Sequence, residues 1–388
     1  MNKISVVTGT RAEYGLLSNL IKLIDKDKYF KLQLIVTGSH LSKKFGETYN
    51  EIRNDGIKIS KKINILSNSD TENSIINSTS IAISKIGKIL NLFSPKALII
   101  LGDRFEILSS AIAANLLRIP VYHFHGGERT EGLIDESIRH AVTKMSTLHF
   151  VANEVYRKRV IQLGENPKRV FDIGGMGIDV IKKNKNIGKK KLEEELKIRF
   201  KKRIFLVCYH PVTLENNTAK LQFTNLLKVL SKFDNTTIIF TSPNSDANNN
   251  IILYLIKDFV KKKLNSYFFE SLGKEKYYSM LKIVDLVIGN SSSGIIEVPY
   301  FKIPTINIGD RQNGRMKAKS IIDCEPKKNQ IMTAIKFALS KNFLNICKYK
   351  NNNFYGNGGS SRKSFQIIKK NINKITIKKQ FYDLDFKI

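Results

Sequence analysis

The chain has 388 residues, of which 42% are hydrophobic and 26% are charged. At roughly 150 residues per domain, this length predicts two to three domains, and the composition is that of an ordinary globular protein. Uncharged stretches such as Ile107–Leu117 are shorter than the ~18 apolar residues that a membrane-spanning helix needs. We therefore expect neither a fibre, nor a disordered chain, nor a membrane protein.

The first residues lead into a glycine turn without the long apolar region or the small-residue cleavage site of a signal peptide. We therefore expect the chain to stay in the cytoplasm. The three cysteines, Cys208, Cys324 and Cys347, lie far apart. Their odd number and wide spacing predict reduced thiols, and neither a disulfide framework nor a CxxC zinc site.

The formal net charge is +31, an excess that is compatible with nucleic-acid binding. The basic residues, however, form short scattered clusters, such as 182–191 and 369–379, without a recognisable DNA or RNA motif. We favour a solvated basic surface that attracts anionic substrates and expect no nucleic-acid partner. A nucleic-acid-binding module is the non-enzyme alternative, and it predicts steeply salt-dependent binding.

Short β-branched runs alternate with longer helical patterns, which is typical of parallel βαβ units. Strands are predicted at 4–7, 32–37, 97–101 and 121–124, and again at 204–207, 238–240, 286–289 and 305–308. Because the rhythm restarts after residue 200, we expect an α/β fold with two Rossmann-like domains. Ligands of such sheets bind beyond the carboxyl ends of the strands, so we expect the two domains to face a central cleft.

A connection between the two halves is predicted near residues 172–190, where three glycines precede a lysine-rich polar stretch. We expect an N-terminal domain at 1–175 and a C-terminal domain at 176–358. A loop rich in asparagine and glycine precedes the basic tail at 359–388. We expect this tail to form a helix that packs back on the body.

Several polar residues that follow predicted strands are candidate anion ligands. Ser291 and Ser292, in GNSSSGIIE, would lie at a helix N-terminus, which binds anions; an ordinary N-cap is the alternative. Glu297 would accept hydrogen bonds from sugar hydroxyls or be a plain first-turn carboxylate. Arg11, in TGTRAEYG, offers a fork of donors to a phosphate or binds a neighbouring carboxylate. His210 is a phosphate or sugar ligand, or a hydrogen-bonded loop histidine.

Acidic residues follow strands in two further motifs. GDRFE places Asp103 and Arg104 directly after a strand, and IDESIRH places Asp135, one turn before Arg139, at the start of a helix. Two carboxylates from different loops can serve as base and acid. The alternative is that Asp135 caps its helix and forms an ion pair with Arg139.

The motif HFHGGE places His123 and His125 on one strand face, because side chains alternate with a period of two. With Glu128 as a third ligand, this spacing is compatible with a metal hydrolase, which chelators would inactivate. We instead expect no metal, because Gly126 and Gly127 indicate a close backbone approach to a ligand.

Taken together, eight motifs resemble the hydrolysing UDP-N-acetylglucosamine 2-epimerases of bacterial sialic acid synthesis. They are TGTRAEYG, LGDRFEILS, HFHGGE, IDESIRHAVTKMSTLHF, NEVYRKRVIQLGENPKRVFDIG, YHPVT, GNSSSGIIEVP and INIGDRQNGR, spread from residue 8 to about residue 315. The resemblance implies two Rossmann-like domains of the glycosyltransferase-B type. It also implies anti elimination of UDP to 2-acetamidoglucal and then hydration to N-acetylmannosamine, without a nicotinamide cofactor or a metal.

The resemblance also assigns roles by position. Asp103 and Asp135 match catalytic acids of the family, and His125 or Glu128 takes the place of the glutamate in the HIEGGE motif of many members, so the division into acid and base stays open. The positions that match contacts to the diphosphate and sugar are Arg11, Arg104, His210, Ser291, Ser292 and Arg311, and those near the uridine and its ribose are Asn244 and Glu297. Arg139 is a further substrate-binding candidate.

The favoured interpretation is a cytoplasmic enzyme that converts UDP-N-acetylglucosamine for sialic acid synthesis. The alternative is the same reaction on UDP- or GDP-linked N,N'-diacetylbacillosamine for legionaminic acid synthesis. The two sugars differ at carbons 4 and 6, away from the leaving group, so these motifs do not separate them. A glycosyltransferase of the same architecture is the rival enzyme class, and by analogy we expect a homo-oligomer, either a dimer or a tetramer.

Overall fold

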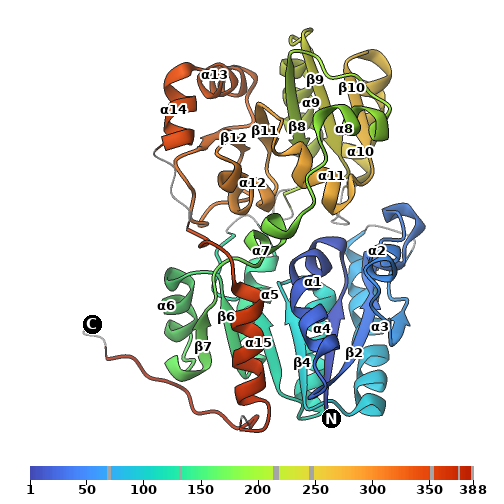
Figure 1. Ribbon diagram of the computed structural model, residues 1–388, viewed down its shortest axis with the longest axis vertical. Helices are drawn as coiled ribbons and strands as arrows, with labels where there is room; N and C mark the ends of the chain where they lie inside the picture. Colours follow the sequence, from blue (N-terminus) through green and yellow to red (C-terminus); the bar gives the residue numbers. More distant parts are fainter. Residues whose placement is uncertain are drawn as a thin grey trace. The chain divides into compact units, whose positions relative to one another are not determined.

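The computed structural model describes residues 1–67, 71–130, 133–212, 218–243, 249–349, 354–374 and 376–385. The chain divides into two compact units, each a parallel sheet covered by helices (Figure 1). Unit 1 comprises Met1–Glu128, Asp135–Val180 and Tyr355–Ile388, and unit 2 comprises Arg129–Ile134 and Ile181–Phe354. The predicted α/β class with two Rossmann-like halves is confirmed. The exact domain limits at 175 and 358 stay predictions.

The sheet of unit 1 has seven strands in the order β3-β2-β1-β4-β5-β6-β7. Their bounds are β1 Asn2–Thr8, β2 Phe30–Thr37, β3 Lys61–Ile63, β4 Ala97–Leu101, β5 Val121–Phe124, β6 Leu148–Val151 and β7 Val170–Asp172. Strand order reverses between β1 and β4, and such a switch point is where parallel sheets bind ligands. The turns after β1, β4 and β5 are therefore the first place to look for a site.

The helices of unit 1 pack on both faces of this sheet. Their bounds are α1 Arg11–Lys26, α2 Tyr49–Asn54, α3 Glu72–Phe93, α4 Phe105–Leu116, α5 Asp135–Met145, α6 Glu154–Gln162 and α15 Ser360–Asn371, with short 3-10 turns at Gly38–Leu41, Lys43–Phe45 and Pro167–Arg169. Helix α1 begins where Thr10 Oγ1 accepts the Glu13 amide at 3.2 Å, which is the usual role of an N-cap threonine. Helix α7, Met176–Lys183, carries the chain from unit 1 into unit 2.

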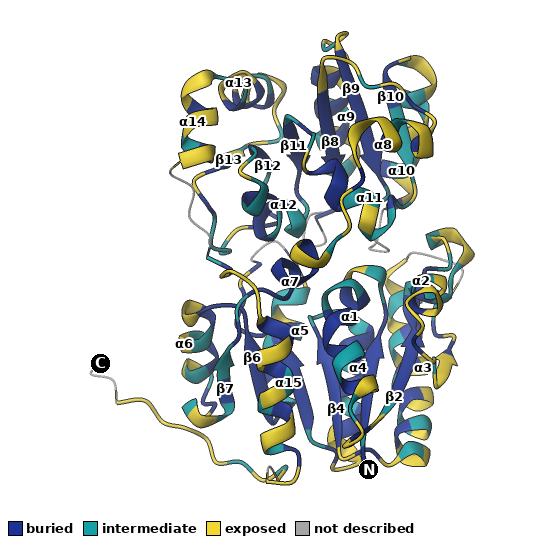
Figure 2. Cartoon of the chain, viewed as in Figure 1, coloured by how far each residue is buried: buried dark blue, intermediate teal, exposed yellow. Residues whose placement is uncertain are grey.

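The central strands of unit 1 are almost entirely buried, while the outer faces of its helices are exposed (Figure 2). The rings of Phe124 and Phe150 stack at 4.4 Å between β5 and β6. In the same core, the Phe365 ring of α15 meets the Phe30 ring at a centroid distance of 5.8 Å. The expectation that the C-terminal helix packs back on the body is therefore confirmed.

Beyond α15 the chain runs as an extended segment that is tied to unit 1. Lys379 Nζ donates to Glu165 Oε1 at 2.7 Å, and Lys144 Nζ donates to the same oxygen at 2.7 Å. The other oxygen of Glu165 lies 3.0 Å from His149 Nε2. This cluster joins a fully buried histidine of β6 to the C-terminal segment.

The sheet of unit 2 has six strands in the order β10-β9-β8-β11-β12-β13, with the same reversal, here between β8 and β11. The strands are β8 Arg203–Cys208, β9 Thr236–Thr241, β10 Ser266–Phe269, β11 Leu286–Gly289, β12 Thr305–Ile308 and β13 Ile321–Cys324. The helices are α8 Lys189–Leu196, α9 Ala219–Leu230, α10 Asn249–Lys262, α11 Gly273–Met280, α12 Ser292–Ile296, α13 Lys328–Ala338 and α14 Lys341–Tyr349, with a 3-10 turn at Val298–Phe301.

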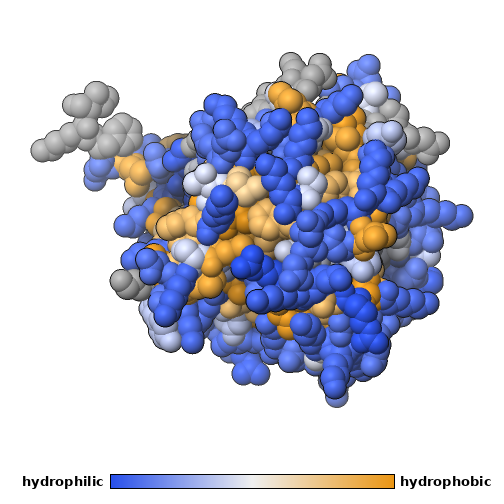
Figure 3. Space-filling view, turned by 90° about the horizontal axis from the view of Figure 1, so that it is seen from above, coloured by the Kyte–Doolittle hydropathy of each residue, from blue (hydrophilic) through white to orange (hydrophobic). Residues whose placement is uncertain are grey.

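Hydrophilic residues cover most of the face shown in Figure 3, around a smaller apolar area. With a net charge of +31, such a surface gives the protein a positive long-range field that favours anionic ligands. Among the described residues, no helix combines the length and the apolar character that crossing a membrane requires.

Candidate active site

A buried arginine gathers the acidic residues of unit 1. Arg139, on α5, is 1% exposed. Its Nε donates to Asp103 Oδ2 at 2.7 Å, and its Nη1 donates to Glu136 Oε2 at 2.8 Å and to the backbone carbonyl of Glu128 at 2.9 Å. Burial lowers the pKa of this guanidinium, but the charge of Asp103, followed by those of Glu128 and Glu136, outweighs burial, so the net effect is a raised pKa. Arg139 is therefore permanently charged, and it fixes the turns after β4 and β5 against α5.

The predicted catalytic residues lie on these same turns. Asp103 follows β4, and its side chain is 20% exposed, so it is held by Arg139 but still reached by solvent. Glu128 is 2% exposed, and its Oε1 lies 3.1 Å from His125 Nδ1. Asp135 is the first residue of α5 and is half-buried. Unit 1 therefore brings Asp103, His125 and Glu128 to the carboxyl ends of β4 and β5, beside the start of α5.

His123 has a supporting role that the sequence did not indicate. It is fully buried, with Nε2 2.9 Å from the Gly102 carbonyl and Nδ1 3.3 Å from Thr143 Oγ1. Burial lowers its pKa to about 3, so the ring is neutral and holds the turn that carries Asp103. Strand β5 ends at Phe124 and His125 has a positive φ of 65°, so the prediction that both histidines share one strand face is wrong. A search of the described residues finds no group of three or more histidines, cysteines or acids able to hold a metal ion.

The glycines after His125 are required by packing within unit 1. A Cβ on Gly127 would lie 2.4 Å from the carbonyl oxygen of Tyr156 on α6. A Cβ on Gly126 would lie 3.0 Å from Thr143 Oγ1. The close approach predicted from these glycines is real, but it is to helices of the protein, so it is not evidence for a ligand.

Arg11 and Arg104 lie at the N-terminal ends of two helices that follow neighbouring strands. Arg11 is the first residue of α1 after β1, and Arg104 is the N-cap residue of α4 after β4. Helix N-termini carry partial positive charge and exposed N–H groups, and guanidinium groups add full charges and donors. This edge of unit 1 is therefore suited to an anionic ligand.

In unit 2, Asn290 fixes the histidine turn. Asn290 is fully buried; its Oδ1 accepts the His210 amide at 2.7 Å, and its Nδ2 donates to the His210 carbonyl at 2.8 Å. Arg311, which is 6% exposed, donates to the Asn290 carbonyl at 3.2 Å and to the Pro211 carbonyl at 3.3 Å. Arg311 therefore joins the turns after β8 and β11, and its role as a substrate ligand stays a prediction.

The serine turn begins α12 as predicted, with Ser291 as its N-cap residue. Within the described residues, the Ser291 side chain makes no capping hydrogen bond, and its role as an anion ligand stays a prediction. Glu297 accepts a hydrogen bond from Tyr278 Oη at 2.5 Å and another from Ser293 Oγ, so its carboxylate is fixed at the end of α12.

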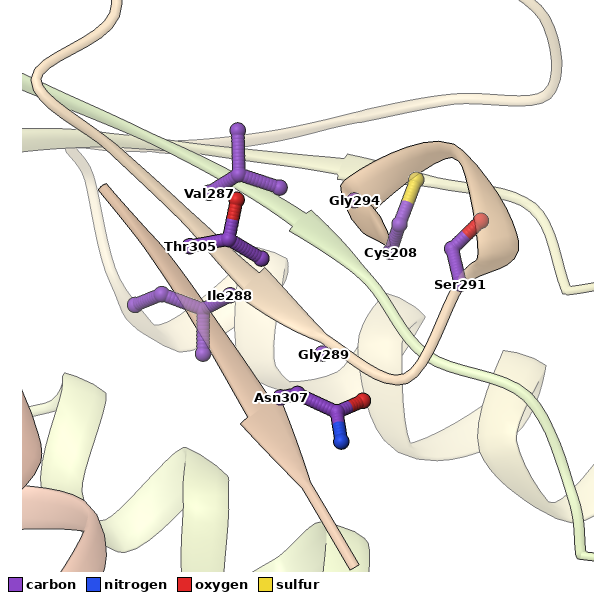
Figure 4. Close-up of a pocket in the computed structure, with 8 residues that line it drawn as sticks. All are labelled: Cys208, Val287, Ile288, Gly289, Ser291, Gly294, Thr305 and Asn307. Atoms are coloured by element: carbon purple, nitrogen blue, oxygen red, sulfur yellow. The ribbon is translucent and has the colours of Figure 1, made fainter. Parts of the chain in front are cut away.

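A small pocket lies directly behind this turn (Figure 4). It is lined by the ends of β8, β11 and β12 and by α12, and its residues are Cys208, Val287, Ile288, Gly289, Ser291, Gly294, Thr305 and Asn307. Ser292 is half-buried in the first turn of α12. The remaining predicted nucleotide ligand, Asn244, lies outside the described residues.

Two residues that organise the site were not among the predicted site residues. Glu136 and Asn290 both stand inside quoted motifs, but only contacts distant in sequence show what they do. Glu136 accepts a hydrogen bond from Arg139 and lies 3.1 Å from His140 Nε2. An acidic residue one helical turn before both a buried arginine and a histidine was the available signal.

Comparison with solved structures identifies the class of fold. The crystal structure of UDP-GlcNAc 2-epimerase from Neisseria meningitidis bound to UDP-GlcNAc has a TM-score of 0.82 at 19% identity, covering 95% of this chain and 100% of that chain. Together with the two parallel sheets, this defines a two-domain α/β protein of the glycosyltransferase-B type. Residues 22–369 match the family described as UDP-N-acetylglucosamine 2-epimerase. The chain belongs to this family and is an enzyme that acts on nucleotide sugars.

Two relatives are similar over most of their length. One, from Campylobacter jejuni, is named GDP/UDP-N,N'-diacetylbacillosamine 2-epimerase (hydrolyzing); it is 46% identical over 324 residues, which is 83% of this chain and 84% of the relative. The other, from Escherichia coli, is named polysialic acid biosynthesis protein P7; it is 39% identical over 386 residues, which is 99% of this chain and 98% of the relative.

Proposed function

We propose that the enzyme is a hydrolysing 2-epimerase that converts UDP-N-acetylglucosamine and water to N-acetylmannosamine and UDP for sialic acid synthesis. The observation that carries the proposal is the cluster of Asp103, Glu128 and Glu136 around Arg139 at the carboxyl ends of β4 and β5. The similarity to the polysialic acid protein over nearly the whole chain supports this pathway.

The reaction needs a base, an acid and a stabilised leaving group. A carboxylate takes the proton from carbon 2 while the bond from carbon 1 to the diphosphate oxygen breaks and its electron pair leaves with UDP. This forms 2-acetamidoglucal. Water then adds to carbon 1, and a proton returns to carbon 2 on the opposite face, which inverts that centre. Asp103, Glu128, Asp135 and His125 supply these proton transfers, and Arg139 holds the Asp103 carboxylate in place.

The leaving group is an anion, so the enzyme gains most from donors whose hydrogen bonds strengthen as the bond breaks. In unit 1, Arg11, Arg104 and the N-termini of α1 and α4 supply such donors. In unit 2 they come from His210, held by Asn290, and from the serine turn of α12. Glu297, fixed by Tyr278, is placed to accept hydroxyls of the ribose.

The second candidate is the same reaction on UDP- or GDP-linked N,N'-diacetylbacillosamine, favoured by the relative that is 46% identical. The purified enzyme is given UDP-N-acetylglucosamine and both bacillosamine nucleotides in parallel, with nucleotide release measured and sugars identified by NMR. Release of UDP with N-acetylmannosamine supports the first proposal. Release from a bacillosamine nucleotide alone supports the second, and release that requires an added acceptor sugar would indicate a glycosyltransferase.

By analogy with the family, we also propose a homo-oligomer that acts in the cytoplasm. Sedimentation velocity distinguishes a dimer or tetramer from the 44.2 kDa single chain. A single species at the mass of one chain would contradict the first part of this proposal, and recovery of the enzyme outside the cytoplasmic fraction would contradict the second.

A further inference from the structure

Two buried carboxylates meet under the turn that follows β1. Glu13, in the first turn of α1, is 5% exposed, and Glu106, in the first turn of α4, is 1% exposed. Glu13 Oε2 accepts the Gly9 amide at 2.7 Å. Glu106 packs so tightly against the same residue that a Cβ on Gly9 would lie 2.4 Å from Glu106 Oε1. Gly9 is thus held between two acidic side chains from neighbouring helices.

Each carboxylate keeps one oxygen without a hydrogen-bond partner among the described residues. These are Glu13 Oε1 and Glu106 Oε2, and both atoms are buried. A buried oxygen without a partner is costly when its carboxylate is ionised. Two neighbouring carboxylates in a buried place do not both ionise near neutral pH. A proton placed on Glu13 removes both problems, because a neutral carboxyl donates one hydrogen bond and carries no charge.

The charged groups around Glu13 and Glu106 also favour a protonated Glu13. Burial first, and then the charge of Glu106, raise the pKa of Glu13 to about 8. Arg104 faces the pair from the start of α4, with Nε 3.1 Å from Glu106 Oε1. Arg11 lies on the same first turn as Glu13. His40 also contacts this turn, since its amide donates to the Gly9 carbonyl, but burial lowers its pKa to about 4, so it stays neutral.

We propose that Glu13 and Glu106 share one proton, and that this proton sets the charge beneath the nucleotide-binding turn. In the protonated form the Glu13 hydroxyl donates to Glu106, and the single negative charge of the pair is matched by Arg104. Arg11 and the N-termini of α1 and α4 then face no second negative charge that competes with the diphosphate. When the proton is lost, a second negative charge lies under Gly9 and opposes an anionic ligand. Glu13 and Glu106 are therefore positioning residues whose effect on binding depends on pH.

The inference rests on the proposed function, because it takes the ligand of this turn to be a nucleotide diphosphate. It predicts that UDP binds the protonated pair. The dissociation constant should be constant at neutral pH and should rise above about pH 8, approaching about tenfold per pH unit. The ionisation of UDP itself is common to all protein variants, so it cancels when their affinities are compared at each pH.

The test is isothermal titration of UDP into the full-length enzyme from pH 6.5 to 9. In Glu13→Gln the amide oxygen accepts the Gly9 amide and the NH₂ group donates to Glu106, so the variant imitates the protonated pair. Relative to wild type, Glu13→Gln should lose the alkaline weakening. Glu72→Gln, a change of the first-turn glutamate of α3, should keep it. If Glu13→Gln does not fold, Glu106→Gln replaces it; this variant removes the charge that raises the pKa of Glu13 after burial, so its alkaline weakening should begin at a lower pH than in wild type, and an unchanged profile would overturn the inference.

If the UDP affinity of Glu13→Gln falls above about pH 8 as it does in wild type, the proposal of a shared proton is wrong. A wild-type enzyme that binds no UDP at any pH would contradict the proposed function, and the proton would then be read from stability. Glu13 has its pKa raised from 4.5 in the folded state, so its contribution to stability is complete below that value and is lost as pH rises toward about 8. Wild type should lose stability relative to Glu13→Gln across this window, and a constant difference would refute the inference.

Discussion

Replacing Arg139 by lysine tests whether one guanidinium organises the acidic cluster. Arg139 Nε and Nη2 both reach Asp103 Oδ2, at 2.7 and 2.5 Å, while Nη1 reaches Glu136 and the Glu128 carbonyl. A lysine ammonium is a single point and keeps about one of these contacts. Each charge-assisted hydrogen bond contributes about 1.5–3 kcal/mol.

Solvent reduces the cost of the change. The side chains of Asp103 and Glu136 are 20% and 26% exposed, so water partly replaces the lost donors. We therefore expect Arg139→Lys to destabilise unit 1 by about 3 kcal/mol. Arg139→Leu leaves both carboxylates without a cation, and we expect a loss of about 4 kcal/mol.

The assay is urea unfolding followed by circular dichroism, with hydrogen exchange of peptides from β4 and α5 to locate the effect. Arg53→Lys is the control in the same unit, because Arg53 is exposed and its guanidinium lies 5.2 Å from the Tyr49 ring, and such exposed contacts contribute about 0.5–1 kcal/mol. If Arg139→Lys stays within about 0.5 kcal/mol of wild type, a range typical of neutral surface changes, Arg139 does not organise the cluster. Faster exchange in α5 but not in β4 would likewise show that the link to Asp103 is unimportant.

Three further predictions follow from the same geometry. Gly289→Ala should destabilise unit 2 by more than about 3 kcal/mol, because the φ of Gly289 is +142° and a Cβ would lie 1.8 Å from the Cys208 carbonyl oxygen; normal urea unfolding of this variant would contradict the backbone described for the β8–β11 pair. Burial raises the pKa of Glu165, but hydrogen bonds from its histidine and lysine partners outweigh burial and lower the pKa to about 2. The ionised Glu165 therefore stabilises the fold fully above pH 4.5, and this contribution, about 3 kcal/mol, is lost as the pH falls toward 2. Glu165→Gln should not show this loss in an acid-unfolding experiment. Asp103→Asn should lower kcat at least about 100-fold with UDP affinity largely kept, whereas Arg11→Ala should weaken UDP binding about tenfold or more; equal losses of UDP affinity in both variants would refute this division of roles.

The central strands of both sheets were predictable because they are continuous apolar runs that end in glycine and polar residues. The sheet edges were not. Strand β3 has the sequence KKI, and only its isoleucine is buried, so its pairing with β2 comes from position and not from composition. Strand β6, LHFV, lies inside the sheet next to the β7 edge and is buried, but it has only four residues and no glycine directly after it. Edge strands are short and polar because they must avoid pairing with other chains.

The site divides in the same way. That Asp103 and His210 follow strands is visible in the sequence, and the topology places both at carboxyl edges. The sequence does not show which groups an arginine side chain contacts in the folded protein. Arg311 stands in a motif that indicates a ligand for phosphate, yet its donors bind the carbonyls of Pro211 and Asn290, about which the local sequence says nothing. Arg139 was considered as a partner of Asp135 one helical turn away, and the local sequence did not indicate its contact with the distant Asp103.

Unit 1 has two clusters of acidic side chains near the point where its strand order reverses, and their negative charge is neutralised in two different ways. Beside β5 the charges of Asp103 and Glu136 are met by Arg139, which stays charged at every pH at which the protein folds. Beside β1 the extra carboxylate is met by a proton, which leaves as the pH rises. The positive charge of the first arrangement therefore does not change with pH, while the charge of the second arrangement, under the turn after β1, does. It follows that alkaline loss of activity should appear in nucleotide affinity before it appears in the proton-transfer steps.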